Sequence, residues 1–416
     1  MNLFSQYDKF NSTAPASGAL ATLRQAGFDY VSHKGLPTRK DEDWHYTSVR
    51  SIAETEYLLG SLVDVKAVSN KEIFANYLNP EFTNLVFVNG KLNENLSDSL
   101  PANVSFGESQ VFADTFLDAF DALNGAYAQQ VYELQIKAEE KVAKPLHLVF
   151  VSVATGGAIM NHPRLKVVVG ARANASVLES YYGFGGRYLV NSFCEIEVKE
   201  SAKLVYARVQ CDDLAADNIG RTQVSLQKFA QFESLAFAAG ALLSRHSLDV
   251  QLKGAGADAQ VLGVYATKGQ QHVDNTTLID HQIGECNTNQ LYKGILDETS
   301  KAVFCGKVLI RKDAQKANSA QLNNNLLLDS RAEADSKPCL EIYADDVKAA
   351  HGSTVGQLDA DEIFYMQSRA IQKDQAILML SYGFLTEVIF KLSDVKVQKW
   401  LSKHLQTAFE GLHING

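Results

Sequence analysis

NASVL, at residues 174–178, is the first of five short segments in which a small or polar turn leads into an apolar strand. The alanines of these segments are 27, 57, 43 and 18 residues apart, or roughly one or two units of about 20 to 28 residues, the length of a solenoid coil. This spacing predicts a β-solenoid, and an ordinary β-sandwich remains the alternative, because it too has turn signals about every 8 to 12 residues. The other four segments are SAKLV at 201–205, DAQVL at 258–262, SKAVF at 300–304 and NSAQL at 318–322.

Changes in residue pattern along the sequence divide the chain into three regions. Residues 1–145 mix helical and extended patterns and predict an N-terminal helical or α+β domain. From 146 to 357, short runs of Val, Leu, Tyr and Phe alternate with Gly, Asn, Asp and Ser, which predicts a mainly β core. Residues 358–416 have helical periodicity and predict a C-terminal helical domain.

Two local patterns support the mixed character of the first region. Residues 84–92, NLVFVNGKL, carry Asn-Gly between two apolar runs, which predicts a hairpin. Residues 114–127 place Phe116, Phe120 and Leu123 at helical spacing.

Three helices are expected in the last region, over 358–371, over the apolar stretch 376–390 and over 393–410. Asp359 and Asp374 are the predicted caps of the first two, and Gly411 is the predicted end of the third. Three short helices cannot easily bury this much apolar surface among themselves, so the solenoid end or a partner protein must cover the rest. The third helix carries a single apolar stripe of Val397, Trp400, Leu401, Leu405 and Phe409.

Composition excludes several classes of protein. Of 416 residues 46% are hydrophobic and 21% charged, and 27 Gly and 7 Pro are too few for a collagen-like or low-complexity chain. The net charge of −9 disfavours nonspecific nucleic-acid binding. The first residues resemble no secretion signal, and 376–390 is too short to cross a bilayer, so we expect a cytoplasmic protein with no membrane partner. The cysteines are odd in number and form no C-x-x-C pair, which disfavours disulfides and a closed zinc site: Cys194, Cys211, Cys286, Cys305 and Cys339.

The sequence contains no convincing motif for nucleotide binding or for a catalytic nucleophile. GAGADA at 254–259 matches G-x-G-x-x-A, but a strand pattern follows at 260–265 where a dinucleotide site needs a helix, so a solenoid corner is the better interpretation. The sequence contains neither G-x-x-x-x-G-K-[ST] nor G-x-S-x-G. We therefore expect no catalytic residues.

Two polar groups are weaker candidates for chemistry. Asp345 and Asp346 could act as a pair of carboxylates, but neighbours on a strand point to opposite faces, which favours a turn. A metal could be bound by His272, His281 and Cys286. Their spacing matches no local metal motif, however, which favours a structural role as hydrogen-bonded side chains of the solenoid.

His351 lies where the strand-rich region gives way to helices. An exposed imidazole there could bind iron as a neutral ligand, whereas a hydrogen-bonded structural role is the simpler interpretation. One ligand makes no site, so a partner chain would have to supply the others.

An ordered series of motifs resembles the SufD branch of the SufB/SufD family over essentially the whole chain. The motifs are PTRKDEDW at 37–44 with Tyr46 and Thr47, DH at 280–281, NQLYKGIL at 289–296, QLNNNLLL at 321–328, PCLEIYADDVK at 338–348, HGSTVG at 351–356, and Phe364, Tyr365, Ser368 and Arg369.

The resemblance implies a right-handed parallel β-helix flanked by N- and C-terminal domains. It implies a non-catalytic scaffold for iron-sulfur cluster assembly that pairs with SufB through the β-helix edge, forms a possible homodimer when isolated, and docks the ATPase SufC on its C-terminal helices. His351 would then be a ligand, with others from SufB, for iron or a cluster that is bound transiently and is absent from the isolated chain. The family often has Cys-x-His-Gly, but this chain has Ala349. The expected SufC contact comprises Ala376, Ile377, Leu380, Phe384 and Val388.

Two other functions stay open at this point. A β-helix carbohydrate-active enzyme would use acidic residues such as Glu341 and Asp345. A self-associating structural protein would form a stable homodimer that does not bind SufB.

Overall fold

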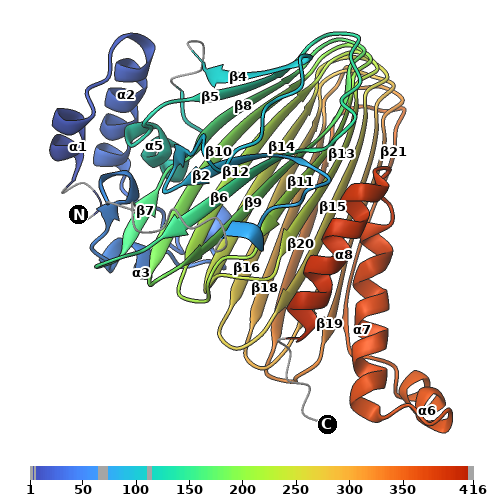
Figure 1. The fold of residues 1–416 in the computed structure, drawn as a ribbon. Helices are drawn as coiled ribbons and strands as arrows, with labels where there is room; N and C mark the ends of the chain where they lie inside the picture. Colours follow the sequence, from blue (N-terminus) through green and yellow to red (C-terminus); the bar gives the residue numbers. More distant parts are fainter. Residues whose placement is uncertain (1–2, 4–5, 64–73, 110–114, 411–416) are drawn as a thin grey trace.

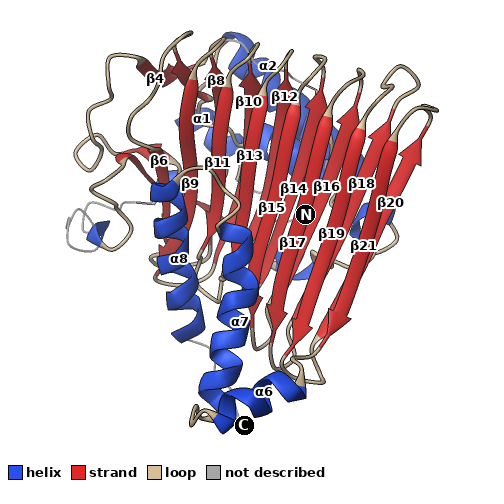
Figure 2. Ribbon diagram, turned by 90° about the vertical axis from the view of Figure 1, so that its right-hand side faces the viewer, coloured by secondary structure: helices blue, strands red, loops and turns tan. Residues whose placement is uncertain are grey.

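The computed structural model describes residue 3 and residues 6–63, 74–109 and 115–410. Its core is a solenoid of two mainly parallel sheets, and from residue 164 onward successive strands alternate between them (Figures 1 and 2). Sheet A contains β4 (Val104–Glu108), β5 (Tyr132–Ile136), β7 (Ile159–Asn161), β8 (Arg164–Val169), β10 (Tyr188–Val198), β12 (Asp217–Leu226), β14 (Leu243–Leu252), β16 (His272–His281), β18 (Lys301–Ile310) and β20 (Glu333–Ile342), with β1 (Leu58–Leu59) beside β7. Sheet B contains β2 (Thr83–Val88), β3 (Lys91–Leu92), β6 (Leu146–Val153), β9 (Asn174–Phe184), β11 (Lys203–Gln210), β13 (Gln231–Ala238), β15 (Asp258–Thr267), β17 (Asn287–Leu296), β19 (Asn318–Leu327) and β21 (Lys348–Gly356).

The predicted β-solenoid is confirmed, but its coils are longer than the spacing of the sequence repeat suggested. The register partners Arg245 and Asp274 are 29 residues apart, and the register partners Gln290 and Gln321 are 31 residues apart. One coil needs this length because it contains two strands and two corners. The predicted repeat also mixed the sheets, since its segment at 300–304 lies in sheet A whereas its segment at 258–262 lies in sheet B.

Corners and turns follow the local sequence. Gly254 and Gly256 lie in the corner between β14 and β15, as predicted, with no helix after them. Gly256 has φ +72, and a Cβ on Gly254 would lie 2.0 Å from the backbone nitrogen of Lys228. The predicted hairpin is β2–β3, in which Asn89 and Gly90 both have positive φ, as a type I′ turn requires.

The N-terminal helices pack on the outer face of sheet A and join it in one hydrophobic cluster. The helix expected from 114 begins at Ala119, because Asp118 caps it by accepting hydrogen bonds from the amides of Phe120 and Asp121; residue 114 itself lies outside the described residues. The helices are α1 (Tyr7–Thr13), α2 (Gly18–Lys34), η2 (Glu42–Trp44), α3 (Arg50–Glu54), η3 (Gly60–Leu62) and α5 (Ala119–Ala126).

The same region also contributes to the solenoid, since β2 pairs with β6 and β5 pairs with β8. Sheet hydrogen bonding therefore runs across the predicted boundary at 145/146. That boundary, like the one at 357/358, stays a prediction.

The C-terminal helices α6 (Ala360–Ser368), α7 (Lys373–Ile389) and α8 (Val395–Glu410) complete the molecule. Asp359 caps α6 as predicted. The prediction that Asp374 caps the next helix is wrong. The helix α7 begins at Lys373, so Asp374 lies within its first turn. The five stripe residues of α8 are all buried, and Gly411 lies outside the described residues.

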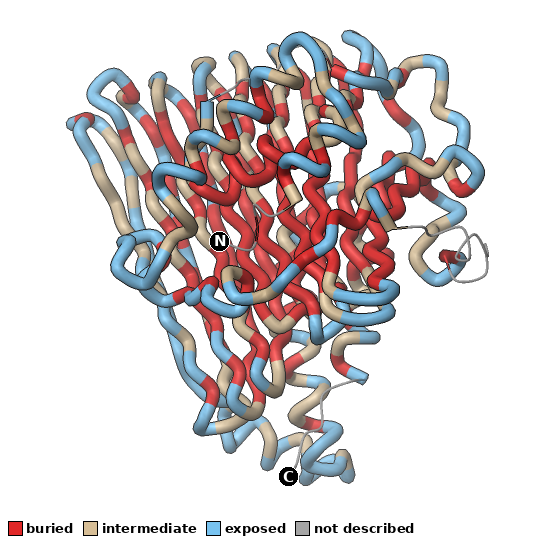
Figure 3. The backbone as a smooth tube through the Cα atoms, turned by 90° about the vertical axis from the view of Figure 1, so that its left-hand side faces the viewer, coloured by how far each residue is buried: buried red, intermediate tan, exposed pale blue. Residues whose placement is uncertain are grey.

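The stripe of α8 and part of the apolar surface of α7 are covered by this chain itself. Both helices lie against sheet B (Figure 2), where Leu385 and Leu401 belong to one hydrophobic cluster with Leu262 and Leu291. The cover is thus the outer side of the solenoid, rather than its end. In Figure 3 buried residues fill the middle of the solenoid, while its last coil is largely intermediate or exposed.

Candidate functional site

The last coil leaves one edge of each sheet open. β20 pairs only with β18, and β21 pairs only with β19, so the outer edge of each strand has no neighbour within the described chain (Figure 2). Ile342, Tyr343 and Val355 are 41%, 64% and 48% exposed at this end. An open edge with apolar side chains is suited to pairing with a strand of another chain.

His351 lies on β21, at this open end, and is exposed. Its register partner on β19 is Gln321, which is buried inside the solenoid. Side chains alternate between the two faces of a strand, so His351 belongs to the row that faces the lumen, together with Ala349, which packs against the solenoid core. The imidazole is therefore accessible at the end of the lumen.

The cysteines nearest this end lie on sheet A. Burial raises the pKa of Cys305 to about 11, so its thiol is protonated at neutral pH and is a poor metal ligand. Cys339, on β20, is half-buried and pairs in register with Lys307. The amine of Lys307 forms an ion pair of 2.6 Å with Glu341.

The residues expected to form a second metal cluster lie apart. His272 lies against Thr47 at 3.0 Å, and burial lowers its pKa. His281 lies inside the solenoid, 3.0 Å from Thr288, and burial lowers its pKa to about 4. The thiol of Cys286 donates to a backbone carbonyl in a corner. Across the described ranges no three His, Cys, Asp or Glu side chains are grouped to hold a metal ion.

Asp345 and Asp346 lie in the corner between β20 and β21. The backbone amide of Asp346 donates to Gln315 at 2.9 Å, and its carbonyl accepts from the amide of Lys316 at 2.5 Å. These are turn contacts, as the adjacency of the two residues suggested.

The five residues of α7 that were expected to contact SufC differ in burial. Ala376 and Val388 are buried, whereas Ile377, Leu380 and Phe384 are half-buried. Four large apolar side chains outside the five named residues are more exposed. Two of them lie on α6, which buries none of its own residues, and the other two lie in the apolar stretch 376–390. They are Phe364 at 70%, Tyr365 at 60%, Met379 at 56% and Phe390 at 61%.

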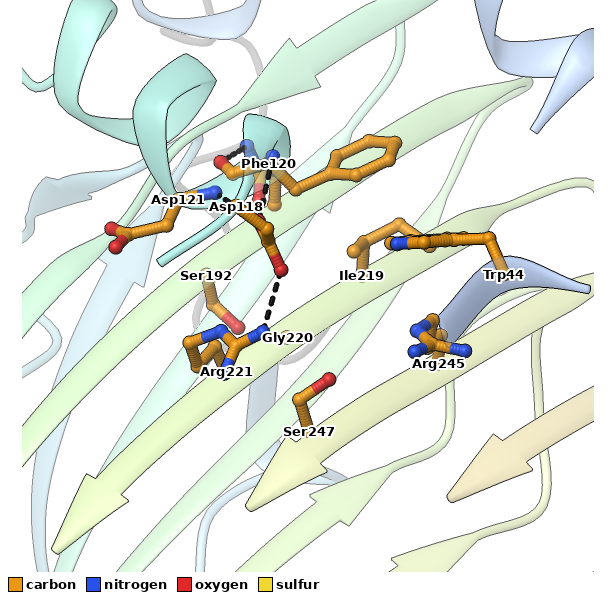
Figure 4. A pocket seen from close by; sticks show the side chains of 11 residues that line it. Trp44, Asp118, Phe120, Asp121, Ser192, Ile219, Gly220, Arg221, Arg245 and Ser247 are labelled. Carbon is orange, nitrogen blue, oxygen red and sulfur yellow. Dashed lines mark hydrogen bonds and ion pairs between the residues drawn. The ribbon is translucent and has the colours of Figure 1, made fainter. Parts of the chain in front are cut away.

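A small pocket lies where the N-terminal region meets sheet A (Figure 4). Asp118, the cap of α5, forms an ion pair of 2.6 Å with Arg221. The guanidinium of Arg245 lies 4.1 Å from the ring centre of Trp44. Burial alone would raise the pKa of Asp118, but Arg221 and a backbone amide outweigh it and lower that pKa. The space is about 10 Å³, about enough for one water, so this is a structural junction.

Two family models together match most of the chain. Residues 150–384 match the model described as "SUF system FeS cluster assembly, SufBD core domain", and residues 1–148 match "SufBD protein N-terminal region". The chain belongs to the SufBD family. The resemblance found in the sequence is thereby confirmed.

Relatives with this family's names cover most of the chain. The SufBD family protein of Synechocystis is 31% identical over 91% of this chain and 89% of its own length. Iron-sulfur cluster assembly protein SufD of Escherichia coli is 30% identical over 86% of both. The chloroplastic protein ABCI7 of Arabidopsis thaliana is 28% identical over 96% of this chain and 88% of its own length. This SufBD protein is therefore SufD-like, in a family named for iron-sulfur cluster assembly.

No helix in the described parts of this SufBD protein is long and apolar enough to cross a membrane.

Proposed function

We propose that this SufBD protein is a non-catalytic scaffold subunit that pairs with SufB and docks the ATPase SufC. Its His351 would be a ligand for iron or a nascent cluster. One observation carries the proposal: an exposed imidazole lies on an open edge strand, at the uncapped end of the solenoid. A SufB strand added to β21 would bring ligands of its own beside that imidazole. The iron or cluster is cargo shared by two chains, so the isolated chain is expected to hold none.

The ligand role is tested by anaerobic copurification with untagged SufB and SufC, with iron and sulfide counted in the complex. His351→Ala should leave the complex intact and lower its iron and sulfide content severalfold, because one ligand is lost. Ser353→Ala is the matched control, two residues along the same face of β21. Normal cluster content in His351→Ala would defeat the ligand role.

SufC docking is proposed on the exposed apolar residues of α6 and α7. Ala376 and Val388 are buried in this chain, so the accessible contact comprises Met379 on α7 and Phe364 and Tyr365 on α6, beside the half-buried residues of α7. Removing α7 and α8 would uncover the apolar face of sheet B, which makes a truncation a poor test.

Surface variants test this contact more sharply. Phe364→Ala with Tyr365→Ala should lose SufC and keep SufB when the complex is copurified. Lys399→Ala, on the exposed side of α8, should keep both. Retention of SufC by the double variant would remove α6 from the proposed contact.

A further inference from the structure

A row of side chains inside the solenoid becomes polar toward its open end. Val261, Gln290, Gln321 and His351 occupy successive register positions of sheet B, on β15, β17, β19 and β21. Gln290 and Gln321 are 2% and 3% exposed. Two buried amides therefore lead directly to the exposed imidazole.

The hydrogen bonds along this row run in one direction. The Gln290 amide nitrogen donates to Thr277 of β16 at 2.6 Å, and the Gln321 amide nitrogen donates to the Gln290 oxygen at 2.7 Å. Each amide thus uses its nitrogen toward the interior. The amide oxygen of Gln321 takes no part in these bonds, and it is buried with no hydrogen-bond partner among the described residues, His351 included. A buried carbonyl without a partner is unfavourable, so this oxygen is a ready acceptor.

Packing holds the Gln321 amide in place. Gly306 lies opposite on β18, and a Cβ there would be 2.0 Å from the Gln321 amide nitrogen. Because Gly306 has no side chain, the amide fits between the sheets, and any larger residue would displace it. The acceptor is therefore fixed by its surroundings before any partner arrives.

We propose that Gln321 is a positioning residue for His351. Its amide oxygen, which bonds to no described residue in this structure, accepts a hydrogen bond from one N–H of the imidazole once that exposed ring turns toward it, and neighbouring strands are about 4.8 Å apart. That bond fixes the tautomer, so the other ring nitrogen is unprotonated and faces the open end as a ligand for a metal ion. The inference rests on the ligand role proposed for His351.

The contact itself is tested by NMR of the full chain labelled with ¹⁵N-histidine, with the His351 signals assigned by their loss in His351→Ala. The ring nitrogens of neutral His351 should show one dominant tautomer. In Gln321→Leu their shifts should move toward the averaged values of a free imidazole. Thr277→Val is the control: it breaks the far end of the row, leaves the Gln321 oxygen in place and should keep the dominant tautomer. Averaged shifts in the unsubstituted chain, or no change in Gln321→Leu, would overturn the inference.

Its consequence is tested in the complex with SufB and SufC at limiting iron. Gln321→Leu should weaken iron retention about tenfold, the lower end of the usual effect of a group that orients a metal ligand. The double variant with His351→Ala should be no worse than His351→Ala alone, whereas additive losses would contradict the positioning role. Normal iron content in His351→Ala would defeat the proposed function, and the NMR result would still decide the contact.

Discussion

Arg245 is a buried guanidinium that joins two distant parts of the chain. It forms an ion pair with Asp274 on the next strand and lies over the ring of Trp44, while the hydroxyl of Thr47 donates to the same carboxylate. Both partners of the ion pair are almost fully buried. The N-terminal segment is thereby held on sheet A.

Arg245→Ala should lower the free energy of unfolding by about 3–5 kcal/mol, because it leaves the Asp274 carboxylate buried without its cation. The measurement is urea denaturation followed by Trp fluorescence. Arg50→Ala removes an ion pair with Glu54 that is open to solvent, so it should change the free energy of unfolding far less. Equal effects of the two substitutions would contradict the buried role.

Buried histidines should make stability fall on acidification. Burial lowers the pKa of His281 to about 4, and of His147 and His162 to about 3, whereas the unfolded chain protonates histidine near 6.5. Below about 6.5 the unfolded state binds protons that the folded state does not, so the stabilisation is complete above 6.5 and is lost as the pH falls to about 4 for His281 and to about 3 for the other two.

His281→Asn should reduce the slope of unfolding free energy against pH between about 6.5 and 4 by up to about 1.4 kcal/mol per pH unit, the contribution of one proton. Urea denaturation across that range measures it. A slope unchanged from that of the unsubstituted chain would show that His281 is not held neutral.

Among the elements, α8 depends most plainly on a surface provided by another element. Its apolar stripe covers sheet B, and Leu401 is fully buried there. Leu401→Ala should lower the free energy of unfolding by about 2–5 kcal/mol, through lost burial and the cavity left behind. Chemical denaturation should show this loss. Lys399→Ala, on the exposed side of the same helix, should change stability by no more than about 0.5 kcal/mol.

The whole molecule is a one-dimensional stack with helices on part of each sheet and an open last coil. An isolated chain with such an edge should associate with a second copy through β20 and β21. Light scattering after gel filtration should give a dimer. Tyr343→Lys, which places a charge beside the edge, should give a monomer that melts at the same temperature, whereas Phe364→Lys on α6 should stay dimeric. A Tyr343→Lys dimer would place self-association elsewhere.

Local patterns in the sequence predicted much of this molecule. Turn glycines, alternating strands and the helical stripe from Val397 to Phe409 depend on near neighbours in the chain, so they predicted the solenoid, the β2–β3 hairpin and α8. His351 also came from the sequence, through the motif that it shares with the family. The coil length was underestimated because similar segments of the two sheets were aligned with each other.

Contacts between distant residues required the tertiary structure. The packing of Trp44 on Arg245, the side of sheet B that α8 covers and the row from Gln290 to His351 each join segments that are at least one full coil apart in the sequence. A short pattern specifies which face of a strand a residue occupies, but the register of successive coils decides which residues become neighbours. For that reason the sequence alone could single out His351, while only the folded chain placed Gln321 in register beside it.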